Sequence, residues 1–114
     1  MKESFETSEK VHAGHTVVSV VGELDVATAP DLRIRLDEAI DRAVQNAVLV
    51  DLLEVTFIDS TALGVLISGL KRSQGAGGEL RIVVAEPRIL KIFEITGLTD
   101  VFSIFPTIDE ATAV

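Results

Sequence analysis

The sequence predicts a small α/β domain with a mixed β-sheet, in which the elements follow the order ββαβαβαβα. Short apolar or β-branched runs alternate with stretches whose apolar residues recur every three or four positions. This is the pattern of strands alternating with amphipathic helices, and it implies parallel strands joined by right-handed crossovers. Only residues 12–15 separate the first two strand-like runs, which favours an antiparallel hairpin at the start.

Length and composition set the broad class of the protein. The 114 residues suit one domain with a single hydrophobic core, so we expect 1–114 to form one unit. Hydrophobic residues make up 47% of the chain, which indicates a globular protein. The apolar runs are shorter than the ~20 residues of a membrane helix, and the polar start MKESFETSEK is unlike a signal peptide. We therefore expect a cytoplasmic protein without membrane contact.

Charge and residue usage exclude several functions. A net charge of −8 argues against direct nucleic-acid binding, which needs a basic surface. There is no Trp or Tyr on which bases could stack. The absence of Cys excludes disulfides, Cys-based zinc sites and thiol catalysis.

Each expected element follows from a local pattern. We expect strands over 5–11, 16–21, 47–53, 80–84 and 101–105. We expect helices near 28–43, 61–74, 87–96 and 107–112. Gly97 is expected to end the third helix.

Caps and charge pairs support the first and last helices. Thr28 with Asp31 resembles a capping box, and so does Thr107 with Glu110. On the outer face of the first helix, four-residue spacing predicts two ion pairs, Arg33–Asp37 and Glu38–Arg42.

The residues between the central strand and the second helix form the main candidate site. Asp59, Ser60 and Thr61 lie directly before the apolar pattern of that helix. Their side-chain oxygens can cap free backbone N–H groups, and a helix N-terminus also accommodates a phosphate. Ser60 or Thr61 is therefore a candidate helix cap, a candidate phosphorylation acceptor, or both.

The second helix has an unusual face of mostly small residues. Three- and four-residue spacing places Thr61, Gly64, Val65, Ser68 and Arg72 on it. Gly64 and Gly69 each cost about 1 kcal/mol relative to Ala in a helix interior. The small residues indicate either close packing of this helix on the sheet or a smooth docking surface beside Thr61.

Other candidate sites lack supporting residues. Asp51, Glu54 and Asp59 are a possible catalytic carboxylate cluster, but no cofactor motif, triad or metal-ligand set accompanies them. Asp51 at a predicted strand end is a candidate aspartyl-phosphate site of a receiver-like module, yet the expected acidic pair and Lys are missing. A nucleotide-binding module would need a phosphate loop, which is absent. We expect no catalytic activity and no cofactor.

The two histidines are a weak metal-site candidate. His12 and His15 flank a turn and lack further His or Cys ligands, so we interpret them as solvated loop residues.

Two further motifs stand out: Gly22-Glu23-Leu24-Asp25, before the first helix, and Asp59-Ser60-Thr61-Ala62-Leu63-Gly64, opening the second. At this separation the pair resembles the motifs of the STAS family, and more narrowly those of the free-standing bacterial anti-sigma factor antagonists. The similarity extends over nearly the whole chain in element order and length. It implies a STAS-like fold and a role in transcription regulation, in stress response or sporulation.

The resemblance also implies a partner switch controlled by phosphorylation. In such proteins the unphosphorylated antagonist binds an anti-sigma factor that is also a serine/threonine kinase, and so releases a sigma factor. The kinase phosphorylates the antagonist and a protein phosphatase restores it. Carried over by position, the acceptor is Thr61, with Ser60 as the runner-up. This chain has Thr61 and Ala62 where the commoner form has Ser and Gly.

The partner-binding residues come partly from the resemblance and partly from the helix face. The resemblance places Asp59 and Ser60 beside the acceptor, and Asp25 on a neighbouring loop. The shared helix face adds Gly64, Val65 and Ser68.

Overall fold

The computed structural model describes residues 5–43 and 47–113. The elements in chain order are β1 (Glu6–His12), β2 (His15–Leu24), α1 (Ala29–Ala43), β3 (Ala47–Ile58), α2 (Ser60–Gly75), β4 (Glu79–Val83), α3 (Pro87–Ile95), a 3-10 turn η1 (Leu98–Asp100), β5 (Ser103–Phe105) and α4 (Ile108–Thr112). The predicted order ββαβαβαβα is confirmed. Gly97 lies past the end of α3 with φ of 75°, as expected of a glycine that stops a helix.

The five strands form one sheet with the order β1-β2-β3-β4-β5. β1 and β2 are antiparallel, and the other neighbouring pairs are parallel. The turn between β1 and β2 consists of Ala13 and Gly14, which have φ of 52° and 82°. Positive φ at both central residues is the geometry that matches the twist of a tight hairpin.

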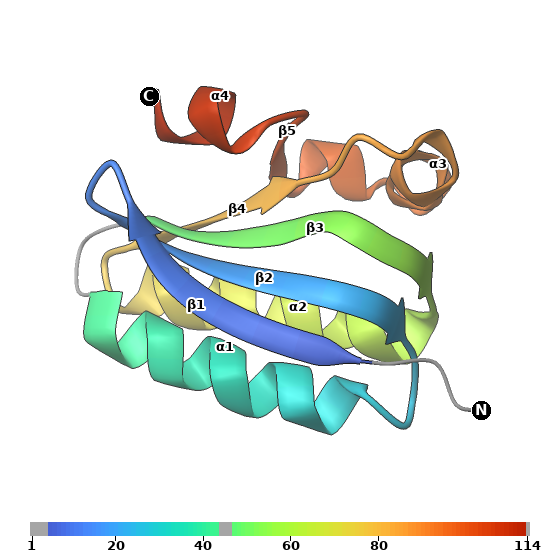
Figure 1. The fold of residues 1–114 in the computed structure, drawn as a ribbon, viewed down its shortest axis with the longest axis horizontal. Helices are drawn as coiled ribbons and strands as arrows, with labels where there is room; N and C mark the ends of the chain where they lie inside the picture. The colour runs from blue at the N-terminus through green and yellow to red at the C-terminus, as the bar shows by residue number, and fades with distance from the viewer. Residues whose placement is uncertain (1–4, 44–46, 114) are drawn as a thin grey trace.

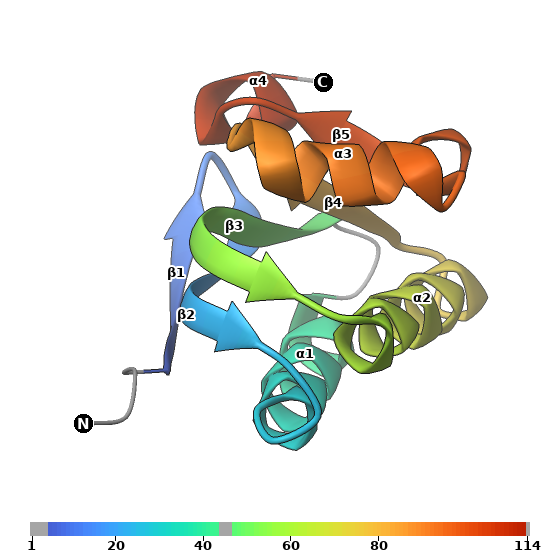
Figure 2. The same cartoon turned by 90° about the vertical axis from the view of Figure 1, so that its right-hand side faces the viewer.

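Helices cover both faces of the sheet. α1 and α2 lie side by side on one face, and α3 and α4 lie on the other side (Figures 1 and 2). The main core joins α1, α2 and α3 to the middle strands. A smaller cluster lies under α4 and contains Val17, Ala47, Leu49, Val83 and Ala111.

Strand β3 is longer than predicted. The expected strand ended at Leu53, where the charged Glu54 interrupts the apolar run, but β3 continues to Ile58. Its register against β2 shifts twice. Ser19 pairs with Asp51 but Val21 with Glu54, and Gly22 pairs with Val55 but Glu23 with Phe57. Each shift inserts an extra residue into β3, which is the signature of a β-bulge. The bulges allow Glu54 to stay exposed while the strand goes on to the start of α2.

Candidate functional site

The N-terminus of α2 is capped by Asp59. This residue has extended backbone geometry, and its Oδ1 accepts a hydrogen bond from Ala62 N at 3.1 Å. Its own N–H donates to Leu24 O at 3.0 Å, which ties the start of α2 to the end of β2. The hydroxyls of Ser60 and Thr61 therefore do not cap the helix, so that alternative was wrong. Both residues are exposed, and within 5–43 and 47–113 no hydrogen bond engages either hydroxyl.

The loop between β2 and α1 lies next to this cap and has its own hydrogen-bond network. The Asp25 carboxylate accepts from Ala27 N at 2.9 Å and from Thr28 N at 3.1 Å. Thr28 Oγ1 accepts from Asp25 N and donates to Glu23 O, both at 2.9 Å. The predicted capping box of Thr28 with Asp31 was thus wrong, because the hydroxyl closes the loop instead of capping α1. The network fixes the loop and leaves Val26 at its tip, 69% exposed.

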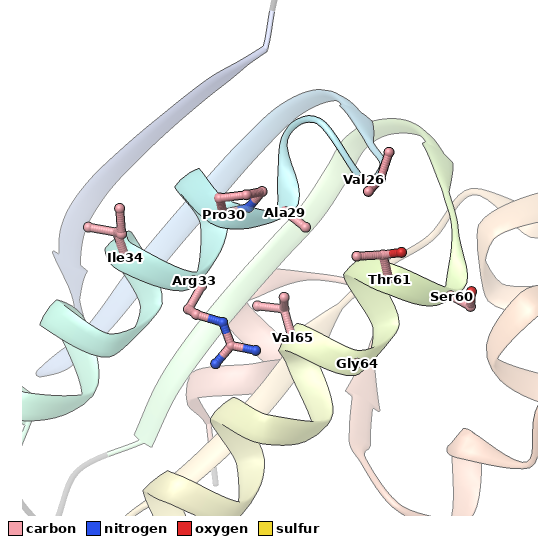
Figure 3. A pocket seen from close by; sticks show the side chains of 9 residues that line it. All are labelled: Val26, Ala29, Pro30, Arg33, Ile34, Ser60, Thr61, Gly64 and Val65. Atoms are coloured by element: carbon pink, nitrogen blue, oxygen red, sulfur yellow. The ribbon is translucent and has the colours of Figure 1, made fainter.

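A groove of about 630 Å³ runs between the N-terminal halves of α1 and α2 (Figure 3). It is lined by Val26, Ala29, Pro30, Arg33, Ile34, Ser60, Thr61, Gly64 and Val65. We call this the α1–α2 groove. Most of its lining is apolar, and Ile34 on its rim is 59% exposed. Exposed apolar surface gathered around a hollow is typical of a protein–protein interface. Thr61 and Ser60 lie at the end of the groove nearest the start of α2.

The small residues of α2 have two different roles. A Cβ atom added to Gly69 would lie 2.7 Å from Leu36 Cδ2, so this glycine permits close packing of α2 on α1. A Cβ atom added to Gly64 would meet nothing within 4 Å, so this glycine keeps the groove open instead. Val65 is only 6% exposed and forms part of the groove floor. The close packing is therefore on α1 rather than on the sheet, as the first interpretation had it, and the docking surface beside Thr61 stays a prediction.

Charged residues connect the helices to each other and to β1. Arg33 Nη1 donates to Ser68 Oγ at 3.3 Å, and Ser68 is half-buried. Arg42 pairs with Glu9 on β1. The side-chain bonds of Arg33 and Arg42 go to other elements, because α1 faces α2 on one flank and β1 on the other. The hydrogen bond to Glu9 raises the pKa of Arg42 and the charge of Glu38 helps to raise it, so the predicted pair of Glu38 with Arg42 persists as a charge interaction.

Arg72 joins the far end of α2 to α1. Its Nη2 lies 2.8 Å from Asp41 Oδ1, and its Nε lies 3.7 Å from Asp37 Oδ1. The hydrogen bond to Asp41 and the charges of Asp41 and Asp37 raise the pKa of Arg72. A raised pKa in the folded state means that the stabilising effect is complete at neutral pH and is lost only in strongly alkaline solution. Arg72 therefore adds no pH dependence near neutrality.

The alternative sites from the sequence do not assemble. Asp51 lies inside β3 rather than at its end, and its carboxylate accepts from Ser19 Oγ at 2.9 Å and from Leu53 N at 3.0 Å. These bonds hold the first bulge, so the receiver-like interpretation loses its strand-end aspartate. Glu54 is exposed, and the carboxylate of Asp59 is used by the helix cap. The described part of the chain contains no group of three or more His, Cys, Asp or Glu residues arranged to hold a metal.

The histidine at the end of β1 has a structural contact. His12 Nε2 lies 3.1 Å from Asp109 Oδ1, which links the hairpin to α4.

Comparison with known proteins identifies the family. The sequence matches the STAS domain over residues 6–111. The chain belongs to the STAS domain family. The anti-sigma-B factor antagonist of Bacillus subtilis is 39% identical over 88 residues, covering 76% of this chain and 78% of the relative. That of Listeria monocytogenes is 35% identical over 105 residues, covering 91% of this chain and 90% of the relative.

A solved structure agrees with this assignment. An anti-sigma factor antagonist from Mycobacterium paratuberculosis is 31% identical and has a TM-score of 0.86, covering 95% of this chain and 91% of that one. STAS anti-sigma factor antagonists are regulatory binding proteins, so the expectation of a protein that is not an enzyme is confirmed. Among the helices in the described ranges, none is both long enough and apolar enough to cross a membrane.

Some groove residues were missed by the sequence analysis. Val26, Pro30 and Ile34 line the groove, but none of them was a predicted site residue. Ile34 falls outside the buried stripe of Leu32, Leu36 and Ile40 on α1, and an isoleucine off the stripe was the available signal. The tip position of Val26 depends on the loop network and had no such signal.

Proposed function

We propose that this protein is an anti-sigma factor antagonist whose unphosphorylated form binds an anti-sigma factor that is also a serine/threonine kinase. Binding would release a sigma factor, and phosphorylation of Thr61 would end the binding. The observation that carries the proposal is the exposed Thr61 hydroxyl at the end of the apolar α1–α2 groove, left free because Asp59 caps the helix. The names of the relatives support the same class of partner.

Thr61 is well placed for a switch that leaves the fold intact. Phosphorylation adds about −1.5 to −2 charges and three acceptor oxygens. The fold accommodates this because Thr61 is exposed and lies in the first turn of α2, where backbone N–H groups favour an anion. A partner fitted to the apolar groove would have to desolvate the phosphate, so the complex would be lost while the domain stays folded.

The remaining predicted site residues have distinct parts in this proposal. Asp59 and Asp25 position the helix start and the neighbouring loop, since both carboxylates are engaged by backbone N–H groups. Ser60 and Gly64 present exposed surface to the partner, and Val65 supports it from the groove floor. Ser68 contributes from its half-buried position one helical turn past Val65, together with the Arg33 side chain that it binds.

The switch also needs an enzyme that removes the phosphate and a cellular compartment in which the partners meet. A protein phosphatase would return Thr61 to its free hydroxyl. Transcription takes place in the bacterial cytoplasm, so we place the complex there, without direct nucleic-acid contact, cofactor or metal.

Affinity capture from the native cell, with mass spectrometry, would identify the partner kinase. Binding of that kinase is then measured by calorimetry for Thr61→Ala, Thr61→Glu and the control Lys71→Ala, an exposed position of α2 outside the groove. Thr61→Ala and Lys71→Ala should bind as the parent does, whereas Thr61→Glu should bind at least about tenfold more weakly, a change of about 1.4 kcal/mol. All three should melt within a few degrees of the parent, because exposed substitutions usually change stability by about 0.5 kcal/mol or less.

Incubation with the kinase and ATP should add one phosphate, which fragmentation would assign to Thr61. A phosphate on Ser60 would make Ser60, rather than Thr61, the phosphoacceptor. No transfer, or equal binding by all variants, would refute the proposed switch. An acid-labile phosphate would indicate an acyl phosphate and therefore a receiver-like protein.

A further inference from the structure

Arg33 is a cation without a carboxylate partner in the described part of the chain. The arginines at the other ends of the two helices are held by acids, Arg42 by Glu9 and Arg72 by Asp41. Arg33 instead donates to the neutral Ser68 hydroxyl at 3.3 Å, a long hydrogen bond on an exposed side chain. Its guanidinium therefore keeps most of its capacity to bind an anion.

Arg33 shares the α1–α2 groove with Thr61 (Figure 3). Gly69 packs against Leu36, so a residue of α1 lies level with one about 33 positions later in α2. By this offset Arg33 lies level with Leu66, between Ser68 and Thr61. Five residues of helix separate Thr61 from that level, which is about 7.5 Å along the axis. Val65 lies between Arg33 and Thr61, and the Thr61 oxygen is turned away from α1 (Figure 3). Both side chains must therefore change rotamer for the guanidinium and a phosphate to meet.

We propose that Arg33 is the internal receptor for a phosphate on Thr61, and that its guanidinium leaves the Ser68 hydroxyl to pair with the phosphate across the groove. This inference rests on the proposed function, since it takes Thr61 as the phosphoacceptor. A guanidinium binds phosphate through two charge-assisted hydrogen bonds, which are stronger than one bond to a neutral hydroxyl. The pair would close the end of the groove and at the same time release Ser68.

The test uses the whole chain with phosphothreonine incorporated at position 61 during synthesis, so that no kinase is needed. The second pKa of the phosphate is measured by phosphorus NMR in the parent, in Arg33→Gln and in the control Arg35→Gln. Arg35 is also on α1 and also bonds to a neutral hydroxyl, that of Thr7 at 3.2 Å, but it lines a separate hollow that includes Thr7 and Glu38. The control therefore removes the same charge from the same helix outside the groove.

A nearby cation stabilises the dianion, so the phosphate pKa should be lower in the parent and in Arg35→Gln than in Arg33→Gln. We expect a difference of about 0.5, smaller than for buried pairs because water screens exposed charges. The difference should shrink as salt rises from 0.05 to about 0.5 M, because the Debye length shortens. Equal pKa values in all three proteins, or equal shifts in both variants, would overturn the assignment of Arg33.

The same proteins separate this inference from the proposed function. If the phosphorylated parent still binds the kinase tightly while the pKa difference is present, the switch is refuted and the Arg33 receptor is supported. If phosphorylation abolishes binding and the pKa values are equal, the switch is supported and the receptor is refuted.

Discussion

Gly64 and Gly69 of α2 should respond in opposite directions to the same substitution. Gly64→Ala places a methyl group in open space and removes a residue of low helix propensity, so the free energy of unfolding should rise by about 1 kcal/mol. Gly69→Ala makes the same propensity gain but puts its Cβ 2.7 Å from Leu36 Cδ2 and 3.3 Å from Leu36 Cγ. Leu36 is 1% exposed, so its side chain has little room to move. Overpacking a core costs about 1–3 kcal/mol, so Gly69→Ala should be destabilised by about 1 kcal/mol.

The difference between the two variants is therefore about 2 kcal/mol, or about 8 °C in melting temperature for a domain of this size. The chain has no Trp and no Tyr, so unfolding is best followed by far-ultraviolet circular dichroism in urea and on heating. Each variant serves as the control for the other, since both lie in one helix and add one methyl group. Should Gly69→Ala be as stable as Gly64→Ala, the close approach of α2 to α1 at this point would be refuted.

Three further substitutions test other parts of the structure. Asp59→Ala removes the acceptor of Ala62 N and should lower the free energy of unfolding by about 1 kcal/mol in urea denaturation; an unchanged value would mean that another group caps α2. Arg81→Gln removes the donor that reaches Ala111 O at 2.6 Å, so amide exchange in α4 should accelerate while exchange in α1 does not; equal acceleration in both would contradict a local role. Ser68→Arg should weaken binding of the anti-sigma kinase at least about tenfold and shift melting by only a few degrees; severe destabilisation would place this position in the core.

The sequence predicted the order of the elements because their patterns are local. The β-branched and apolar runs, the helical stripe of α1 and the glycine after α3 each determine structure from neighbouring residues alone. The extension of β3 is not determined by neighbouring residues alone. A glutamate ends an apolar run in the sequence, but two shifts of register let β3 continue past Glu54, and such shifts depend on pairing with β2.

The incorrect predictions at the site also arose because the contacts depend on groups outside the helix in question. Thr28 and Asp31 have the spacing of a capping box, but Asp25 competes for the same backbone and binds Thr28 N. The side-chain bonds of Arg42 and Arg33 go to partners on β1 and α2, which spacing along one helix does not reveal. Gly64 and Gly69 are equivalent in the sequence, and only the position of Leu36 distinguishes them.

In α1 and α2, the residues that stabilise the domain are different from those that would determine which partner it binds. Contact between the two helices depends on Gly69 and Leu36, which are buried, whereas Val26 and Ile34 project from the groove rim into solvent. Rim residues can change without repacking the core. A duplicated gene could therefore acquire a new partner through a few substitutions at the start of α1, and a cell containing several such proteins could keep their signals apart while using the same scaffold.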